Sequence, residues 1–452
     1  MSDVDLLELC RRVAATALPG EQVEAYAMRT LETDVEVFDG HVESLSIAGI
    51  DGVGVRVIAD GRQGFAWAGS LDEDVVRDTV GDARDNAGFA EPDDHNGLAT
   101  PADVGTATPA DLDLWRDSLL GVDTDAKVEF ALALDAAVRG ADRRIRGVES
   151  ANYGDGAIER ALANSNGVEA YSRRTICSAS AFAIAGRDEE TQTGYGFAAG
   201  REFTDLARDE IVAMAVDRTV RMLGARQVAG RRLAVVLDPL VTASFLGVLS
   251  AAFNAESMLK GRALFQDRVG EQIAAPLVQV SDDPTDPAMF GAASHDAEGV
   301  PCRRNRLVVD GVLQGFLHNT YTARRAGAVT TGSAARGGFK GTPGVGVKAL
   351  SFQPGARDQA AIVASLDDAF YVQSVSGIHS GTNPISGDFS VGAEGLMVRR
   401  GAFGEPVREV TIASTLPRML TEVVEVGGDL VHLPGSTTGL TLVIGEMTLS
   451  GS

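Results

Sequence analysis

Histidine is the residue type in this chain best suited to metal or hydrolytic chemistry. A peptidase zinc site on one helix needs two nearby histidines and a glutamate, as in His-Glu-x-x-His or His-Glu-x-x-x-His, so that the imidazoles bind the metal and the carboxylate activates water. Neither pattern occurs in the sequence. The six histidines are His41, His95, His295, His318, His379 and His432. The sequence therefore predicts no metal ligands and no catalytic residues, unless folding gathers several of these side chains.

A second group of chemically suggestive residues lies in the last quarter of the chain. Residues 377–381 resemble a Gly-x-Ser-x-Gly nucleophile elbow, but His379 occupies the place of the serine, which excludes that motif. Ser386 and Asp388 place a hydroxyl and a carboxylate beside small residues, an arrangement that suits a peptide contact and equally suits a turn. The candidate peptide-cleft residues are His295, His318, His379, Ser386 and Asp388.

The charge balance argues against nucleic acid as a direct ligand. The chain carries 63 acidic and 40 basic side chains, a formal net charge of -23 at pH 7. Such a surface repels a phosphate backbone unless its basic residues are strongly segregated. The densest basic cluster, Arg303, Arg304 and Arg306, is short and typical of a solvated face. We therefore expect no direct nucleic-acid partner.

Cysteine usage and hydropathy indicate a cytoplasmic protein without a membrane segment. Cys10, Cys177 and Cys302 are too far apart in sequence for a disulfide framework or a short-spaced thiolate metal site. The acidic N-terminus lacks the basic start and apolar core of a secretory signal. The most apolar stretch, residues 233–253, is interrupted by Asp238-Pro239, so it predicts a buried strand and a helix.

Several folded units must position these residues, because 452 residues correspond to about three domains at roughly 150 residues each. Residues 1–90 predict an N-terminal α/β domain. Its apolar periodicity predicts helices over 5–18 and 71–88 and strand pairs over 35–46 and 52–67. Asp39-Gly40 and Asp60-Gly61 interrupt the strand pairs and predict type I′ hairpin turns, because both turn residues must take positive φ.

Residues 91–111 predict a linker, because they contain three prolines and no apolar period. Residues 112–224 repeat the order helix, strands, helix as a central α/β domain, without a residue-level repeat. Its expected elements are helices over 125–139 and 205–223 and strands across 144–197, with turns at 154–156 and 164–167.

Residues 231–452 predict a large, β-rich C-terminal domain, with helices near 241–253 and 415–424. Its glycine-rich run at 332–346 lacks the Gly-x-x-x-x-Gly-Lys-Ser/Thr pattern of a phosphate loop and predicts a mobile or ligand-covering loop. The predicted fold class is therefore α+β: a multi-domain chain with antiparallel sheets flanked by helices.

Seven short segments carry a resemblance to a known family. They are residues 52–57 (Gly-Val-Gly-Val-Arg-Val) with 64–66, 260–271, 296–300, 310–313, 321–324, 383–390 and 406–413. Each is weak alone, but in this order they resemble the TldD/PmbA family, also called modulators of DNA gyrase. The resemblance implies a cytoplasmic metallopeptidase of two related subunits. The TldD type carries a His-Glu-x-x-x-His zinc helix and a later cysteine ligand, whereas the PmbA/TldE type lacks them.

The resemblance implies that this chain is the zinc-free type. Aligned on residues 260–265, the family's zinc-ligand and glutamate positions correspond to Leu246, Gly247 and Ala251, and no cysteine follows Cys302. The apolar residues around them are typical of a core or interface helix. We expect no cofactor in this chain and zinc in a TldD-type partner.

The implied function is that of the non-catalytic subunit of a TldD/TldE metallopeptidase that degrades or processes unfolded and modified peptides. Its partners would be a TldD-type subunit or a second copy of itself, together with peptide substrates bound largely as an added strand. Two alternatives stay open. One is a homo-oligomeric peptide-binding protein without catalysis. The other is a hydrolase with an unrecognised site, for instance His295, His318 and His379 gathered with Asp388 by the fold.

Overall fold

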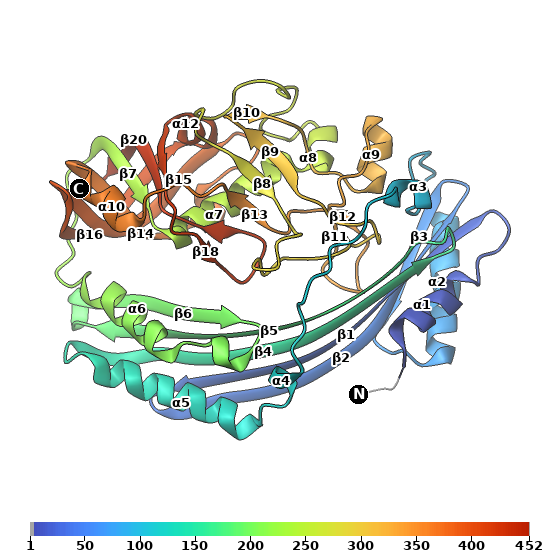
Figure 1. The fold of residues 1–452 in the computed structure, drawn as a ribbon, viewed down its shortest axis with the longest axis horizontal. Helices are drawn as coiled ribbons and strands as arrows, with labels where there is room; N and C mark the ends of the chain where they lie inside the picture. The colour runs from blue at the N-terminus through green and yellow to red at the C-terminus, as the bar shows by residue number, and fades with distance from the viewer. Residues whose placement is uncertain (1–3, 452) are drawn as a thin grey trace.

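The first half of the chain forms one long, curved antiparallel sheet. The computed structural model describes residues 4–451, and its sheet has the strand order β3-β2-β1-β4-β5-β6 (Figure 1). The strands are Glu21–Phe38 (β1), His41–Ala59 (β2), Arg62–Ala68 (β3), Ile145–Asn164 (β4), Glu169–Ala185 (β5) and Gln192–Gly200 (β6). The first strand thus begins well before residue 35, where the alternation had predicted its start.

Two Asp-Gly turns connect the first three strands. Asp39-Gly40 joins β1 to β2 and Asp60-Gly61 joins β2 to β3, with φ between 49° and 75° at all four residues, as the predicted turns require. The turn predicted at 164–167 lies between β4 and β5, where Gly167 has a φ of 88°. The turn predicted at 154–156 is wrong. Those residues continue β4, because β1 and β5 pair with it on both sides.

Helices cover one face of this sheet in two matching sets (Figure 1). One pair packs mainly on β1 to β4, and the other mainly on β4 to β6. The helices are Leu6–Ala14 (α1) and Glu73–Phe89 (α2) in the first set, and Thr124–Ala141 (α5) and Arg208–Val220 (α6) in the second. The two units join through antiparallel pairing of β1 with β4. The repeated order in the sequence therefore becomes a single continuous sheet.

The segment predicted as a linker, residues 91–111, is packed against the rest of the molecule. It buries Leu98 and Ala99 and contains the short helix Pro101–Val104 (α3), after which Asp117–Leu120 forms α4. Composition could not reveal this packing because prolines and polar residues also line an ordered surface segment. The domain boundaries themselves stay a prediction.

The C-terminal segment, residues 230–451, forms a second layer on the other face of the long sheet (Figure 1). Its main sheet has the order β16-β15-β14-β7-β20-β17, in which β7 and β14 pair in parallel. These strands are Arg231–Leu237 (β7), Asp368–Ser376 (β14), Asp388–Arg399 (β15), Ala402–Thr415 (β16), Val423–Val426 (β17) and Leu442–Ser450 (β20). A smaller sheet contains Val280–Asp282 (β8), Asn305–Val309 (β9), Val312–Leu313 (β10) and Leu350–Phe352 (β13).

Short elements complete the C-terminal layer. The helices are Pro239–Leu249 (α7), Ser250–Phe253 (η3), Ala255–Leu259 (α8), Thr320–Ala326 (α9), Gln359–Ala364 (α10), Ile378–Gly381 (α11) and Leu416–Thr421 (α12). Two small ribbons pair Ala334–Ala335 (β11) with Gly344–Val345 (β12) and Val431–His432 (β18) with Thr438–Gly439 (β19). In the first layer, Asp188–Glu190 (η1) and Phe203–Asp205 (η2) are single turns.

The predicted helices near 241–253 and 415–424 are confirmed, and the glycine-rich run contains a ribbon.

The predicted α+β class, with mainly antiparallel sheets flanked by helices and a β-rich C-terminal part, is confirmed. Within the part of the chain that the structure describes, every helix is too short or too polar to cross a membrane.

Candidate functional site

Helix α7 stands where the family resemblance implies a zinc helix. Asp238 caps its N-terminus by accepting a hydrogen bond from the backbone of Leu240 (2.9 Å). Leu246 and Leu249 are 1% and 0% exposed and belong to the large C-terminal core. Phe245 packs beside them, edge-on to Phe389 and stacked on Phe352. The apolar stripe of the sequence is therefore a core face.

The residues around α7 do not fit a zinc ion. Leu246, Gly247 and Ala251 offer no side-chain nitrogen, oxygen or sulfur, whereas a catalytic zinc needs three such ligands and an open position. Across residues 4–451, no three histidine, cysteine, aspartate or glutamate side chains lie close enough together to hold a metal ion. The fold thus does not gather His295, His318, His379 and Asp388 into a metal site.

Two candidate histidines are partly or fully buried in separate places. His295 lines a cavity between the two layers, and its Nδ1 lies 3.0 Å from the Ser294 hydroxyl. His318 is 7% exposed beside α9, and its Nδ1 has no hydrogen-bond partner among the described residues. Burial lowers the pKa of both imidazoles and so favours their neutral form.

The other candidates lie on the surface connection between β14 and β15. His379 is exposed on α11, and Ser386 donates a hydrogen bond of 2.6 Å from its hydroxyl to the exposed Asp388 carboxylate. The backbone amides of Ile385 and Ser386 donate to the side chain of Asn383. The structure therefore brings Ser386 and Asp388 together in an exposed turn, which suits either a peptide contact or a structural turn.

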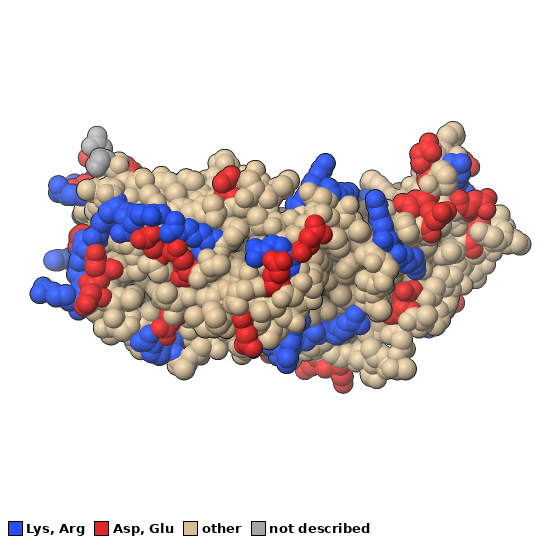
Figure 2. All heavy atoms as spheres, turned by 90° about the horizontal axis from the view of Figure 1, so that it is seen from above, with Lys and Arg blue, Asp and Glu red and all other residues tan. Residues whose placement is uncertain are grey.

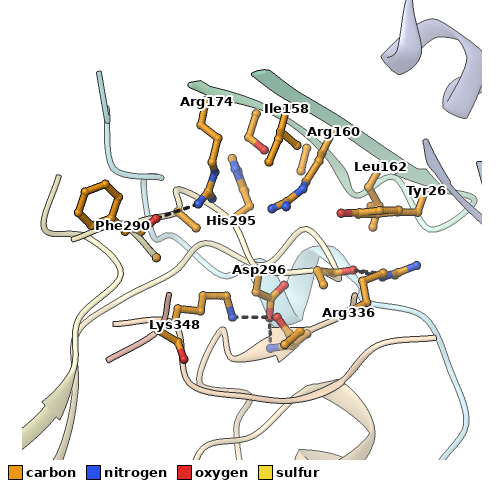
Figure 3. Close-up of a pocket in the computed structure, with 18 of the residues that line it drawn as sticks. Tyr26, Ile158, Arg160, Leu162, Arg174, Phe290, His295, Asp296, Arg336 and Lys348 are labelled. Atoms are coloured by element: carbon orange, nitrogen blue, oxygen red, sulfur yellow. Dashed lines mark hydrogen bonds between the residues drawn. The ribbon is translucent and has the colours of Figure 1, made fainter. Parts of the chain in front are cut away.

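A cavity of about 480 Å³, here called the interlayer cavity, lies between the long sheet and the C-terminal layer. Strand alternation places Ile158, Arg160 and Leu162 on one face of β4. The register pairs Arg160 with Ser172 and Ile158 with Arg174, so β5 contributes its matching face. The opposite wall contains Phe290, His295, Asp296, Arg336 and Lys348 (Figure 3).

Cationic groups outnumber carboxylates around the interlayer cavity. Its cations are Arg160, Arg174, Arg201, Arg336 and Lys348, against the single carboxylate of Asp296 among the lining residues. Asp296 already accepts hydrogen bonds from the backbone amides of Glu298, Val300 and Ala334. Burial, together with the charges of Arg160 and Arg201, lowers the pKa of Arg174 to about 10. The cavity is therefore electropositive.

A buried ion network holds the two layers together next to the cavity. Glu24 of β1 accepts two hydrogen bonds from Arg56 of β2 (2.8 and 2.9 Å) and one from Arg336 of the C-terminal layer (2.7 Å). Glu298 lies 3.6 Å from the same Arg56. Arg336 also stacks over Tyr26, 4.4 Å from the ring centroid. A buried, multiply paired network of this kind is costly to break.

The glycines of the 52–57 motif allow the C-terminal layer to pack closely against β2. A Cβ on Gly52 would lie 2.3 Å from the Phe339 ring, and one on Gly54 would lie 2.3 Å from the Phe339 carbonyl oxygen. Phe339 belongs to the glycine-rich run 332–346, so this run is seated on β2. The motif therefore combines two glycines that permit close docking with Arg56, which forms the buried ion pair.

The cavity arginines could not be recognised from sequence motifs. Arg160 and Arg174 lie in the region 144–197 that was predicted to form strands, and no short motif marks them. The available signal was strand alternation, which places an arginine on the face opposite the helices in each of two neighbouring strands. Recognising it required the pairing register of β4 and β5, and that register is a long-range property.

Comparison with known proteins identifies the family. Three consecutive domain profiles match: PmbA/TldA metallopeptidase domain 1 over residues 23–87, the central domain over 117–223, and the C-terminal domain over 230–451. The fold and these matches define a metallopeptidase-like protein with an antiparallel sheet backed by helices. The chain belongs to the PmbA/TldD family.

Individual relatives resemble the chain over nearly its whole length. The metalloprotease PmbA of Escherichia coli O157:H7 is 27% identical over 95% of this chain and 92% of its own. A Haemophilus influenzae PmbA homologue is 25% identical over 91% and 88%. The crystal structure of TldE from Thermococcus kodakarensis covers 98% of this chain and 99% of its own with a TM-score of 0.88 and 21% identity, which shows the shared fold.

Proposed function

We propose that this chain is a zinc-free subunit that pairs with a zinc-bearing, TldD-type relative. The observation that carries the proposal is the packing of α7. Leu246, at a zinc-ligand position of the family, is a buried core residue, and residues 4–451 contain no cluster of three histidine, cysteine, aspartate or glutamate side chains that could hold a metal ion in its place. In this proposal α7 has a structural role and stabilises the fold of this chain. The partner supplies the metal, the bound water and the general base.

We further propose that the complex acts on unfolded or modified peptides in the cytoplasm. An exposed edge of β2 supports strand-like contacts, because β3 pairs only with residues 53–59 of that strand. The negative net charge supports a role without direct nucleic-acid binding. On the face drawn in Figure 2, acidic and basic side chains are interspersed.

Co-expression with a His-Glu-x-x-x-His relative encoded in the same genome tests this function. We expect one stable complex by size-exclusion chromatography with light scattering, with one zinc per partner subunit and peptide cleavage that is lost when the partner's first motif histidine is changed to alanine. The chain purified alone should contain no stoichiometric zinc.

Two results would overturn the proposal. The first is a chain that remains alone, or only self-associates, at micromolar concentrations beside the relative. The second is stoichiometric zinc in the isolated chain, lost together with peptidase activity in His379→Ala. A self-associating chain that binds peptides without cleaving them would instead support the homo-oligomeric alternative.

A further inference from the structure

Basic side chains from both layers line the interlayer cavity. Arg160 and Arg174 project from β4 and β5 toward His295 and Asp296 on the opposite wall (Figure 3). Arg201 follows β6 and lies over the Phe290 ring, 5.9 Å from its centroid. Because the strand register places the first two diagonally next to each other, the fold holds like charges close together.

These arginines lack carboxylate partners, although several of their donors are engaged. Arg174 donates to the carbonyl oxygens of Phe290 and Ala292 (3.1 and 2.9 Å), and Arg201 donates to that of Met289 (3.0 Å). Such bonds position a guanidinium and leave its charge unneutralised. Within residues 4–451, Arg160, Arg174 and Arg201 form no ion pair with a carboxylate. Arg160 Nε is buried without any hydrogen-bond partner.

The surrounding charges do not remove this excess. Asp113 and Asp205 act on Arg201 only at longer range. Glu24 is already shared by Arg56 and Arg336, and Lys348 lies near Asp296 while donating to the Ala334 carbonyl oxygen. Like charges held together in a poorly solvated space cost free energy, and an oxyanion entering the cavity would lower that cost.

The walls between the cations are apolar. Ile158, Leu162, Ile176 and Phe290 line the same space, and about 480 Å³ falls within the usual range for sites that hold small organic ligands. A small inorganic anion has no apolar group that could pack against these side chains. The cavity therefore fits a carboxylate attached to an apolar body, which the planar guanidinium fork binds in a bidentate manner.

We propose that the interlayer cavity binds a carboxylate carried by an apolar peptide segment, with Arg160 and Arg174 as its main ligands. The carboxylate comes from a peptide C-terminus or from an acidic side chain. The choice of a peptide rests on the proposed function, but the binding site itself belongs to this chain alone. Its test therefore needs no catalytic partner.

The test is isothermal titration calorimetry on the purified full-length chain at low ionic strength. The probes are N-acetyl-Leu-Ala-Phe with a free C-terminus, the same peptide as its C-terminal amide, amidated N-acetyl-Leu-Asp-Phe, and inorganic phosphate. We expect the free acid or the aspartate peptide to bind at least about ten-fold more tightly than the neutral amide, as a charge-assisted bond implies. Whichever of the two binds identifies the source of the carboxylate.

Single substitutions assign the binding to the cavity. Arg160→Gln and Arg174→Gln should each weaken binding by about ten-fold or more. Arg173→Gln is the matched control, because Arg173 neighbours Arg174 on β5 but is exposed and contacts Trp115; it should change affinity by less than about two-fold. Arg160→Gln keeps the test valid if Arg174→Gln fails to fold, because Arg160 Nε makes no hydrogen bond.

The inference is overturned if none of the peptides binds or if the neutral amide binds as tightly as the acids. It is also overturned if Arg173→Gln weakens binding as much as Arg160→Gln. Phosphate binding as tight as that of the best peptide would show that the apolar walls contribute nothing, and would likewise refute a peptide site. Failure to isolate a complex with a TldD-type relative would leave each of these readouts unchanged.

Discussion

The core around helix α7 and the interlayer cavity differ in how their chemical groups are satisfied. Around α7, Phe245, Leu246 and Leu249 are almost fully buried among other apolar side chains. Around the cavity, guanidinium groups outnumber carboxylates, and Arg160 Nε has no partner. Burying charge without a partner costs free energy, whereas burying hydrocarbon is favourable. In this chain, the place where the family resemblance implies metal chemistry contributes stability, while groups able to hold a ligand lie between the layers.

The largest expected change in stability comes from removing a buried side chain from the apolar core around α7. Phe245→Ala should lower the free energy of unfolding by ~3–5 kcal/mol, because it removes a fully buried ring and leaves a cavity. Urea denaturation followed by circular dichroism measures this change. Ser244→Ala, on the exposed face of the same helix, should stay within about 0.5 kcal/mol of wild type. A loss below about 1 kcal/mol in Phe245→Ala would contradict the assignment of α7 to the core.

The second expected effect concerns the ion network beside the cavity. Glu24→Gln should cost about 3 kcal/mol at neutral pH, because it leaves the buried Arg56 and Arg336 guanidiniums without their shared carboxylate. Glu169→Gln is the matched control. Its ion pair with Arg11 is exposed on both sides, so the cost should stay below about 1 kcal/mol.

The comparison of Glu24→Gln with wild type also gives a test by pH. Burial raises the pKa of Glu24, but the charges of Arg56 and Arg336 outweigh it, so its net pKa lies below the ordinary value of 4.5. A carboxylate with a lowered folded-state pKa stabilises the protein fully above the unfolded value and loses that contribution as the pH falls through the folded one. The stability gap between wild type and Glu24→Gln should therefore narrow below pH 4.5. A gap that is constant across this window would contradict the buried pairing.

A smaller change in stability is expected when one arginine of the interlayer cavity is replaced. Arg160→Gln should leave the free energy of unfolding within about 0.5 kcal/mol of wild type or raise it slightly, because it removes a charge that repels Arg174. Differential scanning calorimetry at low and high salt measures this change, with Arg173→Gln as the control. A large destabilisation would indicate that Arg160 is a structural residue.

The smallest stability effect is expected at the exposed turn between β14 and β15. Ser386→Ala removes one solvent-accessible hydrogen bond to Asp388 and should change the free energy of unfolding by less than about 1 kcal/mol. If Ser386 contacts peptide in the complex with a TldD-type subunit, the same variant should raise the KM for peptide cleavage about two- to ten-fold. An unchanged KM would remove Ser386 from the peptide cleft.

Local patterns predicted much of the fold. The Asp-Gly turns around Gly40 and Gly61 were predictable because their positive φ values are a property of two adjacent residues. The helices near 73–89 and 124–141 were predictable from apolar periodicity. The turn wrongly predicted at 154–156 shows the limit of this reasoning. Glycines that would favour a turn in an isolated strand are held straight here by β1 and β5 on either side.

The sequence by itself determined what this chain lacks at the family's zinc positions, because ligand identity is a matter of residue type: Leu246, Gly247 and Ala251 carry no donor atoms. It also determined the two helix–strands–helix units. Only the tertiary structure decided that β1 and β4 join these units into one sheet. Only the tertiary structure, too, placed Arg160 and Arg174 opposite Asp296 and His295. The reason is physical, since a cavity between two layers depends on strand register and layer docking, which connect residues far apart in the chain.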